Sequence, residues 1–373
     1  MGSEVLLYGY GIVCLCMLAF NLVYGIVLRQ GDRRLDKRVR ILSENVKLQL
    51  RRVREGKEIG EGHLRFLEQR LSFVGNLIAF DRVMEDYLPD KSDPAAKQYI
   101  RCMQPVILRL AALYGERESM QTAYFAYFLS KHRIHTCLSA GEELTELLAG
   151  YMKKESLYCH VNALQALCDI GSASGILKAM KLLDRRGSDI HEKILTDGLL
   201  TFSGSHEELI ALLWDNFEHF SNKMKLSVLN YIRFKSGDYC ERMLTILTSD
   251  TAEKELRLCA IRYFGRYAYE PALEALLAFA VDRDPLDWEY TATAVTSLAN
   301  YQGEAVIEAL TQAVHSANWY VRYNAASSLE AHHLDYSDLI EVVGGSDRYA
   351  REMMMYRLDF KRMEQGDWEE ELI

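Results

Sequence analysis

Proline is scarce in this sequence, with only five residues among 373. Proline inside a helix removes a backbone hydrogen bond and clashes with the preceding turn, so the commonest helix breaker is nearly missing. Leu, Ala, Glu and Lys, which favour helices over strands, are abundant. Hydrophobic residues make up 49% of the chain and charged residues 26%, as in folded globular proteins. The composition therefore predicts an all-α fold.

Cysteine pairs and catalytic motifs are also lacking. The eight cysteines, at 14, 16, 102, 137, 159, 168, 240 and 259, include no Cys-x-x-Cys pair, which indicates buried free thiols in a reducing compartment. The sequence contains no Gly-rich phosphate loop, no Gly-x-Ser-x-Gly and no His-Glu-x-x-His. We therefore expect no enzymatic activity and no cofactor.

One histidine cluster is a weak candidate for a metal site. His132, His135 and Cys137 lie within six residues, but no second ligand set has a matching spacing. His332 and His333 form a similar pair at the end of an expected helix. We expect histidines at helix ends or in loops rather than a metal site.

Charge is absent from residues 5–28, and Glu4 is the only charged residue before them. At about 1.5 Å per residue, a helix of this length spans a hydrocarbon core of about 30 Å. A cleaved signal peptide would carry basic residues before the apolar run, and here they begin only at Arg29. Residues 1–28 are therefore predicted to form a single transmembrane anchor. Because Lys and Arg prefer the cytoplasmic side, we expect a cell-membrane protein with its N-terminus outside and its remainder cytoplasmic.

A basic segment follows the expected anchor. Residues 29–57 contain eleven Lys or Arg and four Asp or Glu, a local net charge of +7. Apolar residues recur every three or four positions within 35–54, as in an amphipathic juxtamembrane helix. Either this helix lies on anionic lipid, or it forms a short coiled-coil stalk or packs on the next domain. The candidate lipid contacts are Arg33, Arg34, Lys37, Arg38 and Arg40.

The remainder of the chain is acidic. Residues 58–373 contain 33 basic and 48 acidic residues, a net charge of −15. Binding to nucleic acid needs a basic surface, so nucleic acid is not the expected partner.

An eight-residue phrase recurs in this remainder at intervals of 29–34 residues. Its fourth place is mostly small or apolar and its eighth is always large and apolar, so both lie on one helical face. A second amphipathic run separates successive phrases, giving two helices per unit and the period of an α-solenoid. The phrases occupy 160–167, 193–200, 225–232, 257–264, 291–298, 322–329 and 351–358.

Residues 318–329 resemble the second helix of a HEAT repeat, with its Asp-x-x-Val-Arg-x-x-Ala-Ala-x-x-Leu pattern. Residues 254–264 and 346–358 are weaker copies, and Thr291 and His160 depart from the pattern. The resemblance covers about 160–358. It implies a right-handed α-solenoid of antiparallel helix pairs, with the second helices on the concave face.

The predicted organisation after the basic helix has three parts. Residues 58–157 form an irregular helical block or N-terminal cap, with expected helices at 62–87, 95–114, 117–131 and 141–153. Residues 158–358 form the HEAT-like repeats. Residues 359–373 are an acidic C-terminal cap or tail.

Two sets of residues are candidates for function. A basic ladder marks the first place of most phrases, and the HEAT resemblance implies that it pairs with acidic residues in neighbouring turns; ligand contact is the alternative. An aromatic and arginine cluster supplies the residue types that anchor protein interfaces, although aromatic residues at helical spacing are more often core. The ladder is Lys193, Lys225, Arg257, Arg322 and Arg351, and the cluster is Trp288, Tyr290, Trp319, Tyr320, Tyr323, Tyr263 and Arg262.

These features together predict a membrane-anchored scaffold that presents its cytoplasmic repeats to a protein partner, in a membrane complex. One alternative is an enzyme on a HEAT-like array, of the lyase or glycosylase type. Another is a structural protein that self-assembles or lies on lipid.

Overall fold

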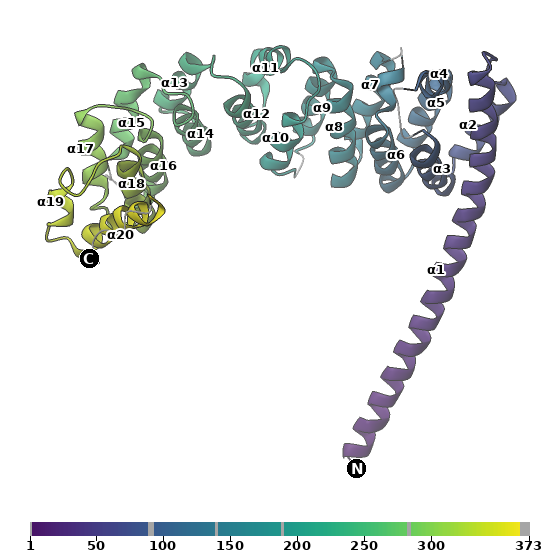
Figure 1. Ribbon diagram of the computed structural model, residues 1–373, viewed down its shortest axis with the longest axis horizontal. Helices are drawn as coiled ribbons and strands as arrows, with labels where there is room; N and C mark the ends of the chain where they lie inside the picture. The colour runs from purple at the N-terminus through teal and green to yellow at the C-terminus, as the bar shows by residue number, and fades with distance from the viewer. Residues whose placement is uncertain (1, 89–92, 139–140, 188–189, 282–284, 366–373) are drawn as a thin grey trace. The chain divides into compact units, whose positions relative to one another are not determined.

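The computed structural model describes residues 2–88, 93–138, 141–187, 190–281 and 285–365. Within these ranges every regular element is helical, with twenty α-helices and five short 3-10 segments (Figure 1). The all-α prediction is confirmed for this part of the chain. The helices form two compact units. Unit 1 comprises residues 1–189 and 201–205, and unit 2 comprises residues 190–200 and 206–373.

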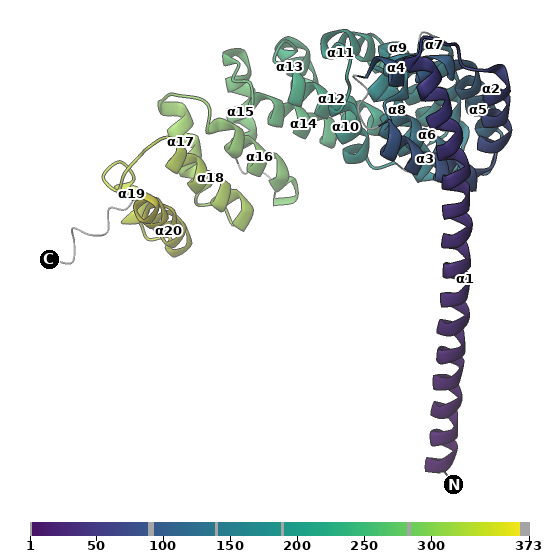
Figure 2. The same cartoon turned by 45° about the vertical axis from the view of Figure 1, so that its right-hand side comes forward.

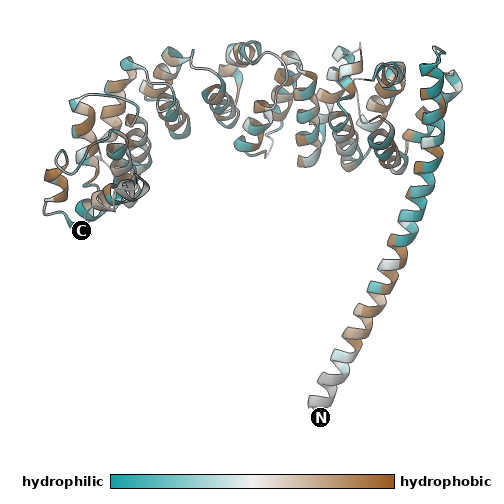
Figure 3. Ribbon diagram, viewed as in Figure 1, coloured by the Kyte–Doolittle hydropathy of each residue, from teal (hydrophilic) through white to brown (hydrophobic). Residues whose placement is uncertain are grey.

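The first helix of unit 1, α1 (Gly2–Arg54), is continuous through the expected anchor and the basic segment. Figure 3 shows its change from an apolar first half to a hydrophilic second half. Leu42, Val46, Leu50 and Val53 are at most 6% exposed, and α1 contacts α3 (Val74–Tyr87) and α4 (Pro94–Cys102). Of the interpretations left open for this segment, packing on the next domain describes the last turns of α1.

The block after α1 contains shorter helices than the sequence predicted. Helix α2 (Glu61–Leu71) ends before Phe73, whose extended backbone precedes α3, so the single helix expected at 62–87 is wrong. The helix expected at 95–114 is also two, α4 and α5 (Gln104–Gly115), because Pro105 lacks the N–H that a continuous helix would need. The block continues with α6 (Ser119–Lys131), η1 (Ile134–Cys137), α7 (Gly141–Gly150) and η2 (Tyr151–Lys153).

Two further helices complete unit 1, and the remaining helices belong to unit 2. In unit 1 these are α8 (Leu157–Ile170) and α9 (Ala173–Arg185). Unit 2 contains α10 (Glu192–Leu200), α11 (His206–Asp215), η3 (Phe217–His219), α12 (Asn222–Lys235), α13 (Cys240–Thr248), α14 (Lys254–Phe264), η4 (Glu270–Ala272), α15 (Leu273–Ala280), η5 (Pro285–Asp287), α16 (Trp288–Leu298), α17 (Glu304–Ala313), α18 (Trp319–Ala331), α19 (Ile340–Val343) and α20 (Arg348–Gln365).

All seven phrases lie on helices, namely α8 and the even-numbered helices α10 to α20. The residue at the fourth place is buried in every phrase, and the residue at the eighth is buried in all but one, where Leu200 is half-buried. The runs between phrases form α9, α11, α13, α15 and α17. In unit 2, α13, α15 and α17 make one layer and α12, α14, α16 and α18 the other (Figures 1 and 2). Burial of the side chains at these two places in the repeats explains the recurrence of the phrase.

Polar side chains join neighbouring second helices in the C-terminal repeats. Ser297 Oγ on α16 donates to the Ile261 carbonyl on α14 at 2.9 Å, and Ser328 Oγ on α18 donates to the Val295 carbonyl on α16 at 2.8 Å. Gly265, directly after α14, allows this close approach, since a Cβ there would lie 2.6 Å from Ser297 Oγ. These bonds fix the register of one repeat on the next.

The prediction that the cysteines are buried thiols holds for half of them. Cys137, Cys159, Cys168 and Cys259 are buried, whereas Cys14 and Cys16 on α1 are exposed. Burial raises the pKa of the Cys159 and Cys259 thiols to about 11, which keeps them protonated and unreactive at neutral pH.

Acidification is expected to destabilise unit 1 through His63 on α2. Its Nε2 lies 2.9 Å from the Tyr99 hydroxyl, its Nδ1 has no hydrogen-bond partner, and the residue is 6% exposed. Burial lowers the pKa of His63 to about 4. Because the unfolded chain binds this proton from about pH 6.5 downward, stability is full above pH 6.5 and falls by about 3 kcal/mol by pH 4.

Urea unfolding of the full chain at several pH values tests this expectation. The variant His63→Gln cannot titrate, so its stability should fall less steeply between pH 6.5 and pH 4.5 than that of the unmodified chain. Equal slopes for the two proteins would contradict the assignment.

Candidate protein-binding face of the repeats

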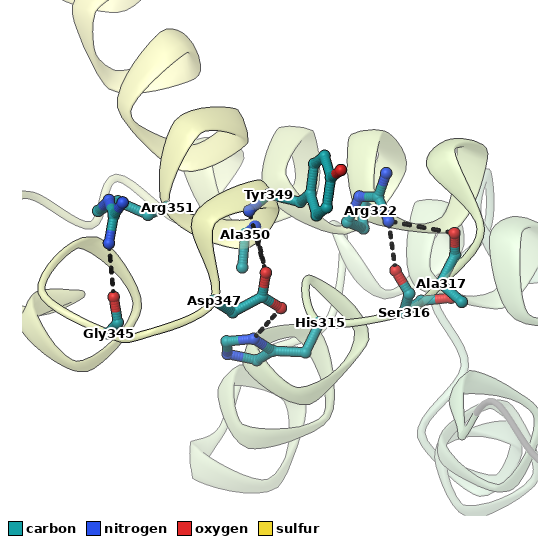
Figure 4. A network of polar contacts seen from close by, with 9 residues as sticks. All are labelled: His315, Ser316, Ala317, Arg322, Gly345, Asp347, Tyr349, Ala350 and Arg351. Atoms are coloured by element: carbon teal, nitrogen blue, oxygen red, sulfur yellow. Dashed lines mark hydrogen bonds and ion pairs between the residues drawn. The ribbon is translucent and has the colours of Figure 1, made fainter.

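The three arginines of the basic ladder bond the backbone that precedes their own helices. Arg322 Nη1 donates to the Ser316 carbonyl at 2.7 Å and to the Ala317 carbonyl at 3.1 Å, and Arg351 Nη1 donates to the Gly345 carbonyl at 2.8 Å (Figure 4). Arg257 Nε donates in the same way to the Leu247 carbonyl at 3.2 Å. Each guanidinium thus reaches back over the turn before its own helix.

These partners differ from the acidic side chains that the HEAT resemblance implied. The arginines bond main-chain carbonyl oxygens, because turn carbonyls lack a helical partner and lie within one side-chain length. An acidic partner is present for Lys225, whose Nζ lies 2.7 Å from Glu218 Oε2, whereas Lys193 is exposed on α10. The carboxylate of Asp347 acts beside the ladder, accepting from His315 Nδ1 at 2.9 Å and from the N–H groups at the start of α20 (Figure 4).

Four aromatic side chains form a stacked row over the first turns of α16 and α18. The rings of Trp288 and Tyr320 lie 5.3 Å apart and nearly parallel, as do those of Trp319 and Tyr323 at 5.1 Å. Trp319 also meets Tyr320 edge-to-face at 5.2 Å. Trp319 is 51% exposed and Tyr320 is 56% exposed. We call Trp288, Trp319, Tyr320 and Tyr323 the aromatic row.

Tyr349 on α20 is an exposed aromatic residue beside this row that the sequence analysis missed. It is 67% exposed, and the Arg322 guanidinium lies 5.3 Å from its ring centre. The sequence did contain a signal for Tyr349: like Tyr320, it lies two residues before an arginine of the basic ladder.

The prediction that Tyr263 contacts a partner is wrong. Tyr263 is fully buried in α14, and its hydroxyl oxygen accepts the N–H of Tyr239 at 3.0 Å. Tyr290 is half-buried, with its ring 5.1 Å from that of Phe279, and it lines a pocket of about 320 Å³ with Arg257. Helical spacing does not distinguish a ring that packs inside its repeat from one that is directed at solvent.

Arg262 is exposed and lines a separate groove of about 500 Å³ on the second helices of unit 2. Arg233 and Arg266 line the same groove. The sequence analysis missed both, because they lie outside the eight-residue phrases. We call this space the arginine groove.

The first histidine of the expected cluster pairs with a carboxylate. His132 Nε2 lies 2.6 Å from Asp81 Oδ1 in the interior of unit 1. Among the residues that the structure describes, no group of three or more His, Cys, Asp or Glu is arranged to hold a metal ion. His332 lies at the end of α18 with its Nε2 3.3 Å from the Leu298 carbonyl oxygen.

The paired, stacked helices of unit 2 define an α-solenoid. More particularly, a family model described as HEAT repeats matches residues 240–330, from α13 to the end of α18. The match and the all-helical architecture together support a HEAT-repeat protein. No curated protein matches the chain. HEAT repeats generally mediate protein–protein interaction, since stacked repeats offer an extended surface for a partner.

Proposed function

We propose that the protein is a membrane-anchored scaffold that binds a protein partner through the aromatic row and acts by binding rather than by catalysis. The observation that carries this proposal is the exposure of Trp319 and Tyr320. Large aromatic rings that are held rigidly by stacking and still reach solvent lose little conformational entropy on binding, and such residues dominate interface energies. The row lies within the part of the chain that the HEAT model matches.

The proposed membrane anchor is the first half of α1. The large apolar side chains between Tyr8 and Leu28 are 48–73% exposed, although water disfavours so long an apolar surface. These residues span about 31 Å at 1.5 Å per residue, enough for one crossing of a bilayer.

The basic residues that follow favour a cytoplasmic location for the repeats. Arg33, Arg34, Lys37, Arg38 and Arg40 are exposed on the same continuous helix. Beside an anionic membrane surface each contributes about 1 kcal/mol to attachment. The proposed topology has one span in the cell membrane, with the N-terminus outside. The partner is then a protein that is reached from the cytoplasmic face, such as a membrane complex, and nucleic acid is disfavoured by the net charge of −15 in residues 58–373.

Replacing Trp319 and Tyr320 together by alanine is expected to weaken partner binding by at least about 30-fold, since one interface anchor contributes about 2 kcal/mol. The measurement is capture from detergent-solubilised membranes by the full chain and by Trp319→Ala/Tyr320→Ala. Thermal unfolding checks that the variant is folded, because Trp319 also stacks on Tyr323.

The matched control is Tyr158→Ala, which removes a tyrosine on α8 that is 69% exposed and distant in sequence from the row. A stoichiometric protein retained by this control and lost from the double variant supports the proposal. Equal capture by both variants rejects the aromatic row as the binding surface. Association of the purified chain with itself, abolished by the double variant, would favour the self-assembly alternative.

A further inference from the structure

The arginine groove is built by four successive second helices of unit 2. Residues of α12, α14, α16 and α18, together with two residues directly after α14, enclose a space of about 500 Å³. Three of the lining side chains are cationic and none is acidic. The lining residues are Arg233, Phe234, Arg262, Gly265, Arg266, Ala292, Thr293, Thr296, Ser297 and Asn324.

The three arginines are not neutralised by carboxylates of the described residues. Arg233 Nε is buried without a hydrogen-bond partner, and the ion pairs of unit 2 involve other cations. Lys254 on α14, for example, pairs with Glu289 at 2.7 Å, and Arg357 on α20 pairs with Glu330 at 2.6 Å. Lys225 on α12 and Lys254 on α14 thus have carboxylate partners, whereas the three arginines of the groove do not.

The pKa of Arg233 reflects the same excess of positive charge in the groove. Burial lowers the pKa of the Arg233 guanidinium, and the positive charges of Arg262 and Arg266 lower it further. An arginine remains protonated at neutral pH all the same. Three like charges around one space repel one another, and an anion bound among them would relieve that repulsion.

The hydroxyl groups that line the groove already donate their hydrogen bonds elsewhere, so the guanidinium groups are the main donors left for a ligand. The hydroxyl groups of Thr293, Thr296 and Ser297 donate to main-chain carbonyl oxygens at 2.7, 2.8 and 2.9 Å. Phe234 is 41% exposed, and the Arg233 and Arg266 guanidinium carbons lie 4.7 and 5.6 Å from its ring centre. The groove thus presents guanidinium donors beside an apolar ring, which suits a carboxylate carried on an aliphatic side chain.

We propose that the arginine groove binds an acidic segment of the protein partner, with Asp or Glu side chains held by Arg233, Arg262 and Arg266. The proposal rests on the protein-binding function proposed above. The planar guanidinium fork matches a carboxylate with two parallel hydrogen bonds. An extended nucleic acid fits less well, because three cations neutralise few phosphates and residues 58–373 are acidic overall.

The test uses the full chain in detergent and a fluorescein-labelled octapeptide of six glutamates and two leucines, followed by fluorescence anisotropy. Saturable binding is expected. Arg262→Glu/Arg266→Glu should weaken binding of the peptide about 100-fold, because two charge-assisted hydrogen bonds are lost. Arg262→Gln/Arg266→Gln should also weaken binding of the peptide. This milder variant keeps the test valid if the charge-reversed chain misfolds. Lys193→Glu, which reverses the charge of one exposed residue outside the groove, should stay within twofold.

Several outcomes would overturn the proposal. One is equal weakening by Lys193→Glu, which would mean that only net charge matters. Tighter, groove-dependent binding of a labelled oligothymidine would make the groove a phosphate site. A tenfold gain in peptide affinity on deletion of residues 366–373, which include four acidic residues, would make the chain's own end the occupant.

A separate variant distinguishes failure of this proposal from failure of the function. Trp319→Ala/Tyr320→Ala should bind the acidic peptide normally while losing the natural partner. If the groove variants retain the natural partner at full affinity, the acidic segment is rejected and the aromatic row stands.

Discussion

Replacing Asp81 by alanine is expected to lower the free energy of unfolding of unit 1 by about 3–5 kcal/mol, the loss that follows when one partner of a buried charged network is removed. Asp81 is 7% exposed on α3. Its carboxylate accepts hydrogen bonds from three side chains: Tyr124 in the middle of α6 at 3.0 Å, Lys131 at the end of α6 at 2.9 Å, and His132 directly after it at 2.6 Å. Alanine would leave the interior His132 and the Tyr124 hydroxyl without this acceptor.

The pKa of Asp81 also indicates that its ionised form stabilises unit 1. Burial alone would raise the pKa of this carboxyl, but the hydrogen bonds from Lys131, His132 and Tyr124 more than offset it, so the pKa lies below its ordinary value of 3.8. The stability that the ionised group contributes is therefore present above pH 3.8 and is lost as the pH falls through its lower folded-state pKa. This window lies below the one expected for His63.

The matched control is Glu85→Ala on the same helix. Glu85 also pairs with Lys131, at 2.8 Å, but its side chain is 52% exposed, so its removal should cost less than about 1 kcal/mol. Urea unfolding of the full chain should be followed by far-ultraviolet circular dichroism, because the sequence of unit 1 contains no tryptophan. Equal losses for the two variants would show that the network does not stabilise the interior.

Deleting residues 1–28 is expected to release the protein completely from the membrane while leaving the helical units folded. The deletion removes the exposed apolar half of α1 and retains Leu42, Val46, Leu50 and Val53, which pack on α3 and α4. Carbonate extraction of membranes should recover the full chain in the pellet and the shortened chain in the supernatant. As a matched point change, Leu18→Arg places a charge at the centre of the span, at a cost of about 3 kcal/mol for insertion.

Orientation is tested with the same material. In intact cells an impermeant thiol reagent should label a cysteine introduced at Ser3 and leave one introduced at Asp250 unlabelled. The reverse pattern would contradict the proposed topology. Retention of the shortened chain in the pellet would show that the basic segment or the repeats hold the membrane without a span.

The repeats were predictable because each one must bury the side chains at the fourth and eighth places of its phrase. Ala260, Ala294 and Ala325 at the fourth place are all fully buried, so the phrase reflects a packing requirement that recurs at every repeat. The breaks near Phe73 and Met103 were missed, since the apolar pattern continues through both. Pro105 was the available signal for the second break. The right-handed sense of the solenoid stays a prediction.

The candidate sites were less predictable, because they depend on which helices meet. Tyr263 and Tyr320 both follow helical spacing, yet the first packs inside its repeat and the second projects into solvent. The arginine groove combines residues from α12 to α18, so it exists only when the repeats are stacked. The partners of Arg322 and Arg351 are carbonyl groups, which no sequence pattern marks.

The central claim, that the repeats hold a protein partner on the aromatic row, is tested most directly by photo-crosslinking in intact membranes. A benzophenone amino acid is placed at position 320 in one protein and at position 158 in another. We expect one discrete, light-dependent adduct with a second protein from position 320 and none from position 158. The absence of an adduct at position 320, or the same adduct from both positions, would contradict it.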